Sequence, residues 1–221
     1  MIRHLLERTA GLVYSATSLG MAKRDSFTRF AMYRSLRGLR GRLPGVKRVL
    51  SISHSTHLAP ILGFEGVTLV EANYPEFNLL SLPFKDGEFD ACLSDQVLEH
   101  IAGPPERAVN EALRVVRPGG YVVHTTCLLT AVHGPGDFWR FTPEGLDFLH
   151  RDSCEVLEAD GWGNTMVPLM TFLGFTWRPV PVTRWHPVTW LATANRRSYA
   201  HMVWVAARKR EIPLDGGRSE G

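Results

Sequence analysis

The sequence contains few cysteines and no long apolar run, and each absence excludes a class of protein. Its three cysteines, Cys92, Cys127 and Cys154, form no CxxC pair, so they provide neither a disulfide framework nor a zinc site. We interpret them as reduced core residues of a cytoplasmic protein. No segment approaches the roughly 18 consecutive apolar residues of a transmembrane helix, and we therefore expect no membrane span.

Acidic residues are scarce at the start of the chain. Residues 1–48 contain eleven lysines and arginines but only Glu7 and Asp25, so this segment carries +9 and the remainder −6, within a net charge of +3. Such a segment can contact nucleic acid, an anionic membrane surface or an acidic substrate. It can also be the solvated face of amphipathic helices beside an acidic body, which is the interpretation we favour.

Strand, helix and strand follow one another in the middle of the chain. Residues 89–95, FDACLSD, form an apolar run that ends in a polar residue, as a buried strand does at its carboxyl end. Residues 104–116 place apolar side chains at helical spacing, with Pro105 in the first turn. RPGG at 117–120 should form a turn, and residues 121–126 the next strand. This βαβ crossover predicts an α/β fold.

The motifs of this region occur in an order that is typical of one family. LPF at 82–84, FD at 89–90, LEH at 98–100 and RPGG at 117–120 resemble the central half of a class I S-adenosylmethionine-dependent methyltransferase. The later HGPGDFWRFTPEGLDFL and GWGN are similar to a compact bacterial subgroup, type 11-like, with a shortened first half. The resemblance implies a Rossmann-like, doubly wound sheet in three α/β/α layers, mostly parallel with an antiparallel last strand. It also implies S-adenosylmethionine as the cofactor.

The chain should comprise one such domain with additions. We expect a basic helical cap at residues 1–45, a methyltransferase-like domain at 46–210 and a disordered tail at 211–221. Residues 162–199 are rich in Trp and Pro. This insertion is too long for a plain turn between the last two strands, so it should form a lid, a substrate wall or a dimer surface.

The cap should contain two amphipathic helices. Leu5, Leu6, Leu12 and Val13 fall on one side of the first helix. We expect that side to pack against the sheet or to cover the cofactor and substrate. A homodimer, if formed, would use these helices or the insertion at 162–199.

The turn that holds the cofactor in this family reads D-x-G-x-G-x-G, and this chain lacks its glycines. After a first strand at 47–53, Ser51 occupies the acidic position, and Ser53, Ser55 and His57 occupy the glycine positions. Glycine lets the cofactor lie against bare main chain. The hydroxyl side chains still permit a close approach, whereas His57 adds bulk. This departure favours a second interpretation, in which the fold has lost catalysis and serves as a binding or regulatory protein.

The resemblance also assigns residues to the adenosine end of the cofactor. Glu71 lies at the end of the expected second strand, where the family's acidic residue accepts hydrogen bonds from both ribose hydroxyls. Glu76 is the alternative if the register shifts. Asn78 stands where relatives carry an Asp that faces the adenine amine, and Leu82 either walls the adenine ring or fills the core.

Two further residues should lie at the edge where open α/β sheets bind ligands. Asp95 and Gln96 end the strand at 89–95 and complete the expected cofactor site. Only 30 residues separate Ser51 from Leu82. This spacing is short for two strands and two crossover helices, so one helix or strand should be missing.

The loop after the strand at 121–126 carries the catalytic candidates. His133 could accept a proton from an attacking hydroxyl, since an imidazole titrates near neutral pH. Asp137 could orient that ring, and Arg140 could bind a carboxylate or phosphate in a bidentate manner. Alternatively, Asp137 and Arg140 pair with each other and fix the loop. We expect no metal site, because Asp95 and Asp137 alone are too few ligands.

These observations favour a methyltransferase that acts on a small molecule through O- or N-methylation. The cofactor's sulfonium is a strong electrophile, so the protein need only align a nucleophile, exclude water and accept a proton. A nucleic-acid methyltransferase is less favoured, because the N/D-PP-Y/F motif that receives a flipped base is absent. RPGG and LPF argue against a nucleotide-dependent oxidoreductase.

Overall fold

Six strands form the central sheet, in the order β3-β2-β4-β5-β8-β6. The structure is a computed structural model and describes residues 2–211, so all of the expected tail except Glu211 lies outside it. Neighbouring strands are parallel from β3 to β5, and β8 runs antiparallel to both β5 and β6. The strands are β2 (Arg48–Ile52), β3 (Thr68–Ala72), β4 (Phe89–Asp95), β5 (Val116–Cys127), β6 (Cys154–Trp162) and β8 (Met202–Lys209).

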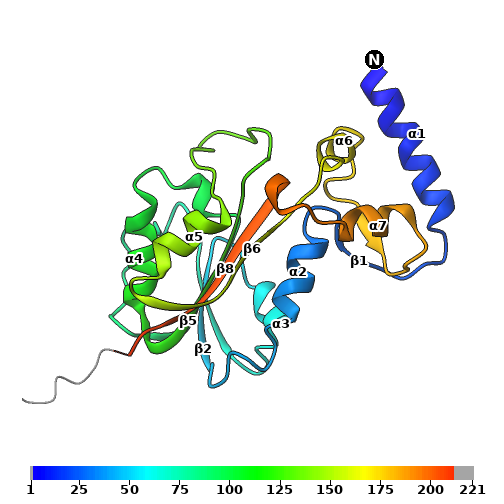
Figure 1. Cartoon of the computed structure of the whole chain (residues 1–221). Coiled ribbons are helices and arrows are strands. Elements are labelled where there is room, and N and C mark those ends of the chain that lie inside the picture. The colour runs from blue at the N-terminus through cyan, green and yellow to red at the C-terminus, as the bar shows by residue number, and fades with distance from the viewer. Residues whose placement is uncertain (1, 212–221) are drawn as a thin grey trace, which may run out of the picture.

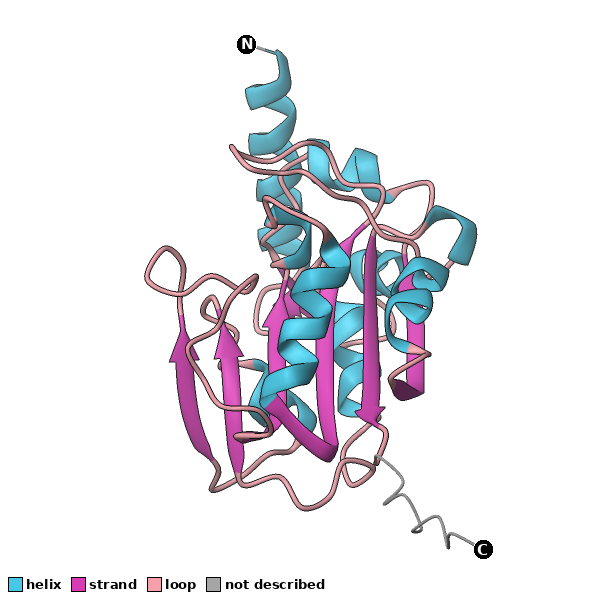
Figure 2. Ribbon diagram, turned by 90° about the vertical axis from the view of Figure 1, so that its left-hand side faces the viewer, coloured by secondary structure: helices cyan, strands magenta, loops and turns pink. Residues whose placement is uncertain are grey.

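Helices cover both faces of this sheet, as Figures 1 and 2 show, and the three-layer α/β/α prediction is confirmed. One face packs against α2 (Phe30–Arg37) and α3 (Leu58–Leu62), and the other against α4 (Pro105–Val115) and α5 (Pro143–His150). Because side chains alternate along a strand, successive residues of one strand enter opposite cores. The sheet is therefore buried on both sides.

The first half of the sheet is short. Residues 73–88 connect β3 to β4 without a helix or a further strand in the described structure. This agrees with the narrow spacing between Ser51 and Leu82. The short helix η1 (Leu98–His100) follows β4 and begins the loop region above the sheet edge.

The prediction of a separate turn at 117–120 is wrong, because β5 begins already at Val116. Val116 pairs with Phe89 and Tyr121 pairs with Ala91, so residues 117–120 bulge opposite Asp90. The Arg117 guanidinium donates a hydrogen bond to the Asp90 carboxylate at 2.5 Å. A Cβ on Gly120 would lie 2.6 Å from the Asp90 carbonyl oxygen, so the bulge requires glycine there.

The start of the chain and the insertion pack together beyond the end of the sheet (Figure 1). The strand β1 (Lys23–Ser26) pairs antiparallel with β7 (Pro179–Pro181). The first helix, α1 (Ile2–Thr17), packs against the insertion through Tyr14, whose ring makes an edge contact with Phe175 at 5.5 Å. The insertion also contains α6 (Val167–Phe172), α7 (Pro187–Thr193) and η2 (Arg197–Tyr199).

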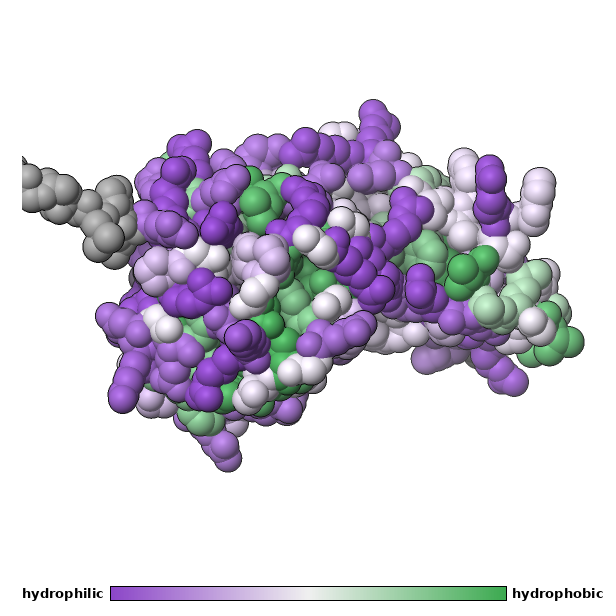
Figure 3. Space-filling view, turned by 90° about the horizontal axis from the view of Figure 1, so that it is seen from below, coloured by the Kyte–Doolittle hydropathy of each residue, from purple (hydrophilic) through white to green (hydrophobic). Residues whose placement is uncertain are grey.

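The expected apolar side of α1 does not pack against the sheet. Leu5, Leu6, Leu12 and Val13 are all exposed, and the residues that α1 buries are Gly11 and Tyr14. Figure 3 shows hydrophobic residues in a patch left of centre and also at the right-hand end of the molecule, the end that holds α1 and α7 in Figure 1. No helix among residues 2–211 combines the length and apolar character that crossing a membrane requires.

We predict that Gly120→Ala destabilises the protein by about 1–3 kcal/mol, because the new methyl group overlaps main-chain and side-chain atoms of the bulge. Urea unfolding followed by circular dichroism measures this loss. Pro118→Ala, at an exposed position of the same bulge, is the control and should change the free energy of unfolding much less. Equal stability of Gly120→Ala and the wild type would show that the bulge can relax.

Candidate functional site

Two cavities open at the carboxyl edge of the parallel strands. The first encloses about 500 Å³ between the ends of β2 and β4, the loop after β3 and residues 135–138. The second encloses about 510 Å³ between residues 129–133, the insertion and the N-terminal region. Gln96 lines both cavities. A ligand in each would therefore meet its neighbour at this side chain.

Three of the seven expected cofactor residues line the first cavity, namely Ser53, Asn78 and Gln96. Apolar side chains complete its wall, including Phe77, Leu79, Leu80 and Ile101. This mixture of apolar surface and a few polar groups is typical of a small-molecule site.

The other four expected cofactor residues lie outside this wall. Ser51 is fully buried within β2, and its hydroxyl has no hydrogen-bond partner. Leu82 belongs to the core, and its main-chain N–H donates to Glu111 at 2.7 Å. The Glu71 side chain is 47% exposed at the end of β3, with one carboxylate oxygen 3.9 Å from His54 Nδ1. Asp95 belongs to a separate hydrogen-bond network.

The turn at 51–57 keeps a glycine-like conformation without glycine. Ser53 and His54 have φ angles of +49° and +63°, in the left-handed region that few non-glycine residues adopt. Side chains hold the turn in place. The Ser55 hydroxyl donates to the Ile52 carbonyl at 2.5 Å and accepts the Asp95 N–H at 2.7 Å. The His54 N–H donates to Asn73 Oδ1 at 2.8 Å.

Asp95 is a buried carboxylate whose hydrogen bonds connect three parts of the fold. The Tyr33 hydroxyl of α2 donates to Oδ2 at 2.5 Å, and His57 Nε2 lies 2.8 Å from the same oxygen. The Thr125 hydroxyl of β5 donates to Oδ1. Arg29 Nε lies 4.0 Å away. Asp95 thus fixes α2, the turn at 51–57 and β5 to one another.

These contacts shift the pKa values of Asp95, His57 and Tyr33. Burial alone would raise the pKa of Asp95, but the His57 hydrogen bond, the Arg29 charge and the two hydroxyl donors outweigh it and hold the pKa at about 2. The hydrogen bond to Asp95 raises the pKa of His57 above 6.5 despite its partial burial. Burial and the neighbouring carboxylate raise the pKa of Tyr33. The His57 imidazole points toward Asp95 and does not line the first cavity.

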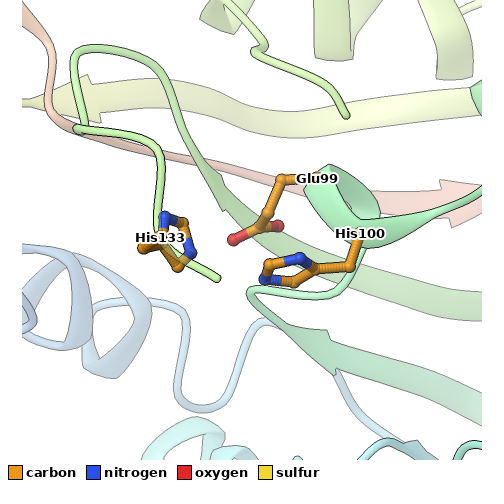
Figure 4. A group of neighbouring side chains, drawn as sticks. All are labelled: Glu99, His100 and His133. Atoms are coloured by element: carbon orange, nitrogen blue, oxygen red, sulfur yellow. The ribbon is translucent and has the colours of Figure 1, made fainter. Parts of the chain in front are cut away.

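A polar cluster lies between the two cavities and brings together Glu99, His100 and His133 (Figure 4). Their donor atoms lie within 4.8 Å of one another. Glu99 is fully buried; its Oε2 accepts a hydrogen bond from Thr126 at 2.8 Å, and Oε1 has no partner. Burial raises the pKa of this carboxyl group. The three side chains offer an oxygen and two nitrogen donors close enough together to hold a metal ion.

Sequence reasoning missed this cluster as a unit. Glu99 and His100 belong to η1, whereas His133 belongs to the loop after β5, and only the fold brings them together. The LEH motif at the sheet edge is the sequence signal that could have suggested it. The His100 and His133 rings meet edge to face, with centroids 5.1 Å apart.

Asp137 connects His133 to Arg140. Arg140 forms a bidentate ion pair with the buried Asp137 carboxylate, with Nη2 2.7 Å from Oδ2. The hydrogen bond between Arg140 and Asp137 lowers the pKa of Asp137 and raises the pKa of Arg140. Asp137 Oδ2 also accepts the His133 N–H at 2.9 Å and lies 3.2 Å from His133 Nδ1. Asp137 therefore contacts both His133 and Arg140, and Arg140 is paired with Asp137 and does not line the second cavity.

The comparisons with known proteins agree with this architecture. Residues 45–124 match the family model described as a methyltransferase domain. An uncharacterized methyltransferase from Mycobacterium sp. (strain KMS) is 50% identical over 54 residues, covering 24% of this chain and 21% of the relative. The matched segment thus spans only about a fifth of that relative.

Solved structures show the same fold over most of the chain. The cyclase SpnF is 17% identical with a TM-score of 0.54, covering 96% of both chains. A Burkholderia thailandensis 1,6-didemethyltoxoflavin-N1-methyltransferase with bound S-adenosylhomocysteine is 14% identical with a TM-score of 0.52, covering 82% of this chain and 79% of that one. The chain therefore has the fold of these structures, and its residues 45–124 match a methyltransferase-domain model.

The His57–Asp95 pair makes stability dependent on pH. The pKa of His57 is higher in the folded protein than its unfolded value near 6.5. Its contribution to the free energy of unfolding is therefore complete below pH 6.5 and is lost as the pH rises through the folded-state pKa. The pKa of Asp95 is lower in the folded protein than its unfolded value of 3.8. Its contribution to stability is complete above that value and is lost as the pH falls toward the folded-state pKa of about 2. We therefore predict that His57→Gln lowers the melting temperature more at about pH 6 than at about pH 9.

Tyr33→Phe is the matched control for that experiment. It removes a neutral donor to the same carboxylate, so its effect on the melting temperature should be similar at both pH values. Thermal unfolding of both variants decides the point. A loss for His57→Gln that does not depend on pH would show that the imidazole stays neutral in the folded protein.

Proposed function

We propose that the protein transfers a methyl group from S-adenosylmethionine to an oxygen or nitrogen atom of a small molecule. The observation that carries this proposal is the pair of adjoining cavities, which share Gln96 and have the Glu99–His100–His133 cluster between them. A two-substrate transfer requires two sites whose ligands meet.

The first cavity suits the cofactor. Its volume of about 500 Å³ lies within the range of small-ligand sites. Phe77, Leu80 and Ile101 offer apolar surface to the adenine, and Asn78 offers an amide to its polar edge. Glu71 is exposed enough to turn toward the ribose hydroxyls. Ser53 presents the left-handed turn at the methionine end. When bound, the cofactor supplies an activated methyl group.

The second cavity suits the methyl acceptor. Leu129, Phe172 and Trp177 provide apolar walls, and Arg3 and Arg29 provide positive charge. An acceptor with a flat apolar part and an anionic group fits this lining. Because N-terminal and insertion residues form much of it, we propose that residues 162–199 act as a substrate wall.

His133 is the proposed proton acceptor. It lines the second cavity, and its Nδ1 lies 3.2 Å from both Asp137 Oδ2 and the Ala131 carbonyl. These acceptors favour a proton on Nδ1, which leaves the Nε2 lone pair free. As the acceptor's oxygen or nitrogen bonds to the methyl carbon, Nε2 takes its proton. The bound cofactor would supply the methyl group and keep the electron pair of the methyl–sulfur bond, so that it would leave as S-adenosylhomocysteine.

The altered turn at 51–57 supports a second candidate, a protein of this fold that binds a ligand without methyl transfer. Its turn lacks the family's glycines and holds two residues in a left-handed conformation. The two candidates differ in cofactor binding and turnover.

Calorimetric titration with S-adenosylmethionine and S-adenosylhomocysteine tests the first cavity. We predict micromolar binding of both, weakened at least about tenfold in Ala102→Trp, because the indole would fill the cavity from an exposed position. The matched control is Ala131→Trp, which fills the second cavity from an equally exposed position. That variant should bind the cofactor normally. No binding by the wild type at millimolar ligand would favour the second candidate.

Replacing His133 tests the proton acceptor. Once an acceptor is found by screening flat anionic phenols and amines, we predict that His133→Gln lowers kcat about 10²–10⁴-fold while cofactor affinity stays unchanged. His4→Gln, an exposed histidine on α1 that lines neither cavity, is the control. Unchanged turnover in His133→Gln would reduce His133 to a structural part of the loop.

A further inference from the structure

One side of α1 is an uncovered apolar stripe. Ile2, Leu5 and Leu12 are exposed by 74%, 66% and 71%, and Thr9 and Ala16 lie exposed between and after them. Within one helix these five positions follow one another at spacings of three, four, three and four residues. Leu19, exposed by 83%, continues the series just beyond the helix end.

The opposite side of α1 is already fixed to its own chain. Tyr14 packs on Phe175 and His186, and Arg178 lies against Gly11. These contacts set the rotation of the helix about its axis. The apolar stripe is therefore held facing outward, and no described residue of the chain covers it.

The alternating spacing indicates what covers the stripe. A repeat of three and four residues has a mean period of 3.5, which is the pattern of a seam between two packed helices. The five positions from Ile2 to Ala16 repeat this pattern twice within α1. The occupant should accordingly be another helix with a matching apolar seam.

We infer that this occupant is α1 of a second copy of the chain, packed antiparallel. In that arrangement the layers pair Ile2 with the second copy's Leu19, Leu5 with its Ala16 and Thr9 with its Leu12. Two of the three layers set a large side chain against a small one, as interdigitated cores require. The stripe is thus complementary to itself in one antiparallel register.

Charge and neighbouring residues agree with this occupant. In the antiparallel pair Arg8 flanks the second copy's Ser15, and Leu6 flanks its Val13, so like charges do not oppose each other. Trp185 is 93% exposed and adjoins His186, which lies 3.1 Å from Thr17 at the end of α1.

An anionic lipid surface fits less well. Three cations of the N-terminal segment are directed into the fold and away from the stripe. Arg37 pairs with Asp25, whereas Arg29, near Asp95, and Arg3, paired with Glu7 over Phe172, line the second cavity. On α1 itself Arg8 flanks one edge of the stripe, and His4 Nδ1 lies 3.5 Å from Glu7. Interfacial helices usually carry a broader basic face.

The first test measures mass in solution. Light scattering coupled to size exclusion should give about twice 24.8 kDa for the wild type at tens of micromolar, and 24.8 kDa for Leu12→Glu. Phe148→Glu, which changes an equally large exposed side chain on α5, is the matched control and should remain dimeric. Circular dichroism should show all three proteins folded. A monomeric wild type, or a dimer that survives Leu12→Glu, would overturn the inference.

The second test identifies the register. The native cysteines are all buried, so Thr9→Cys and Leu12→Cys supply the reactive thiols. Under mild oxidation, a mixture of the two variants should form mostly the mixed disulfide dimer. Homodisulfides of Thr9→Cys alone would indicate a parallel pair and refute the register. Binding of the wild type to phosphatidylserine vesicles, lost in Leu12→Glu, would assign the stripe to a lipid surface instead.

Discussion

The buried carboxylate of Asp95 is the interaction on which the ligand-binding edge depends. A carboxylate that is removed from water is costly unless hydrogen bonds and an opposite charge compensate it. Tyr33, His57 and Thr125 supply the bonds, and Arg29 supplies a further charge. These partners come from α2, the turn at 51–57 and β5. Satisfying one charge therefore sets the relative positions of the elements that border both cavities.

The arrangement of the two cavities follows from the hydrogen bonds of Asp95 and from two additions to the sheet, the N-terminal region and the insertion. The first cavity is built from the carboxyl ends of β2 and β4, which the parallel sheet brings together. The second depends on the N-terminal region and the insertion, which contact each other through β1 and β7. In the proposed function, the sheet edge would therefore hold the cofactor, and the additions to the fold would shape the acceptor site. This separation explains why the motifs point to the cofactor and say little about the substrate.

Most of the fold could be predicted from the sequence because its signals are local. The apolar run at 89–95 and the helical spacing after Pro104 each act within a few residues. The pairing of β1 with β7 could not, since it joins segments about 150 residues apart with no periodic pattern. The bulge at 117–120 escaped notice because RPGG is compatible with a turn as well. Which side of α1 faces outward depends on Tyr14 finding Phe175, a tertiary contact.

The candidate site was predictable only where the chemistry is carried by adjacent residues. The loop around His133 was recognised because His, Asp and Arg occur within eight positions. Its internal Asp137–Arg140 ion pair was one of two alternatives that spacing alone could not separate. Ser51, Leu82 and Asp95 were assigned from the family pattern, yet they are turned into the core or held in a network. The position of a residue on a strand determines where its main chain lies. Which buried hydrogen-bond donors are nearby determines what its side chain contacts.

The loss of the glycines at 51–57 is best understood through that competition. Glycines at positions 55 and 57 would remove the Ser55 hydroxyl that binds the Asp95 main chain and the imidazole that binds its carboxylate. Asp95 would then retain two hydroxyl donors and a distant guanidinium for a fully formed buried charge. The side chains in the turn thus stabilise the carboxylate, and the left-handed angles at Ser53 and His54 keep the main chain in the shape that glycine would give. Because His57 points at Asp95 and away from the first cavity, the altered turn preserves the space for a ligand while replacing the residues that usually border it.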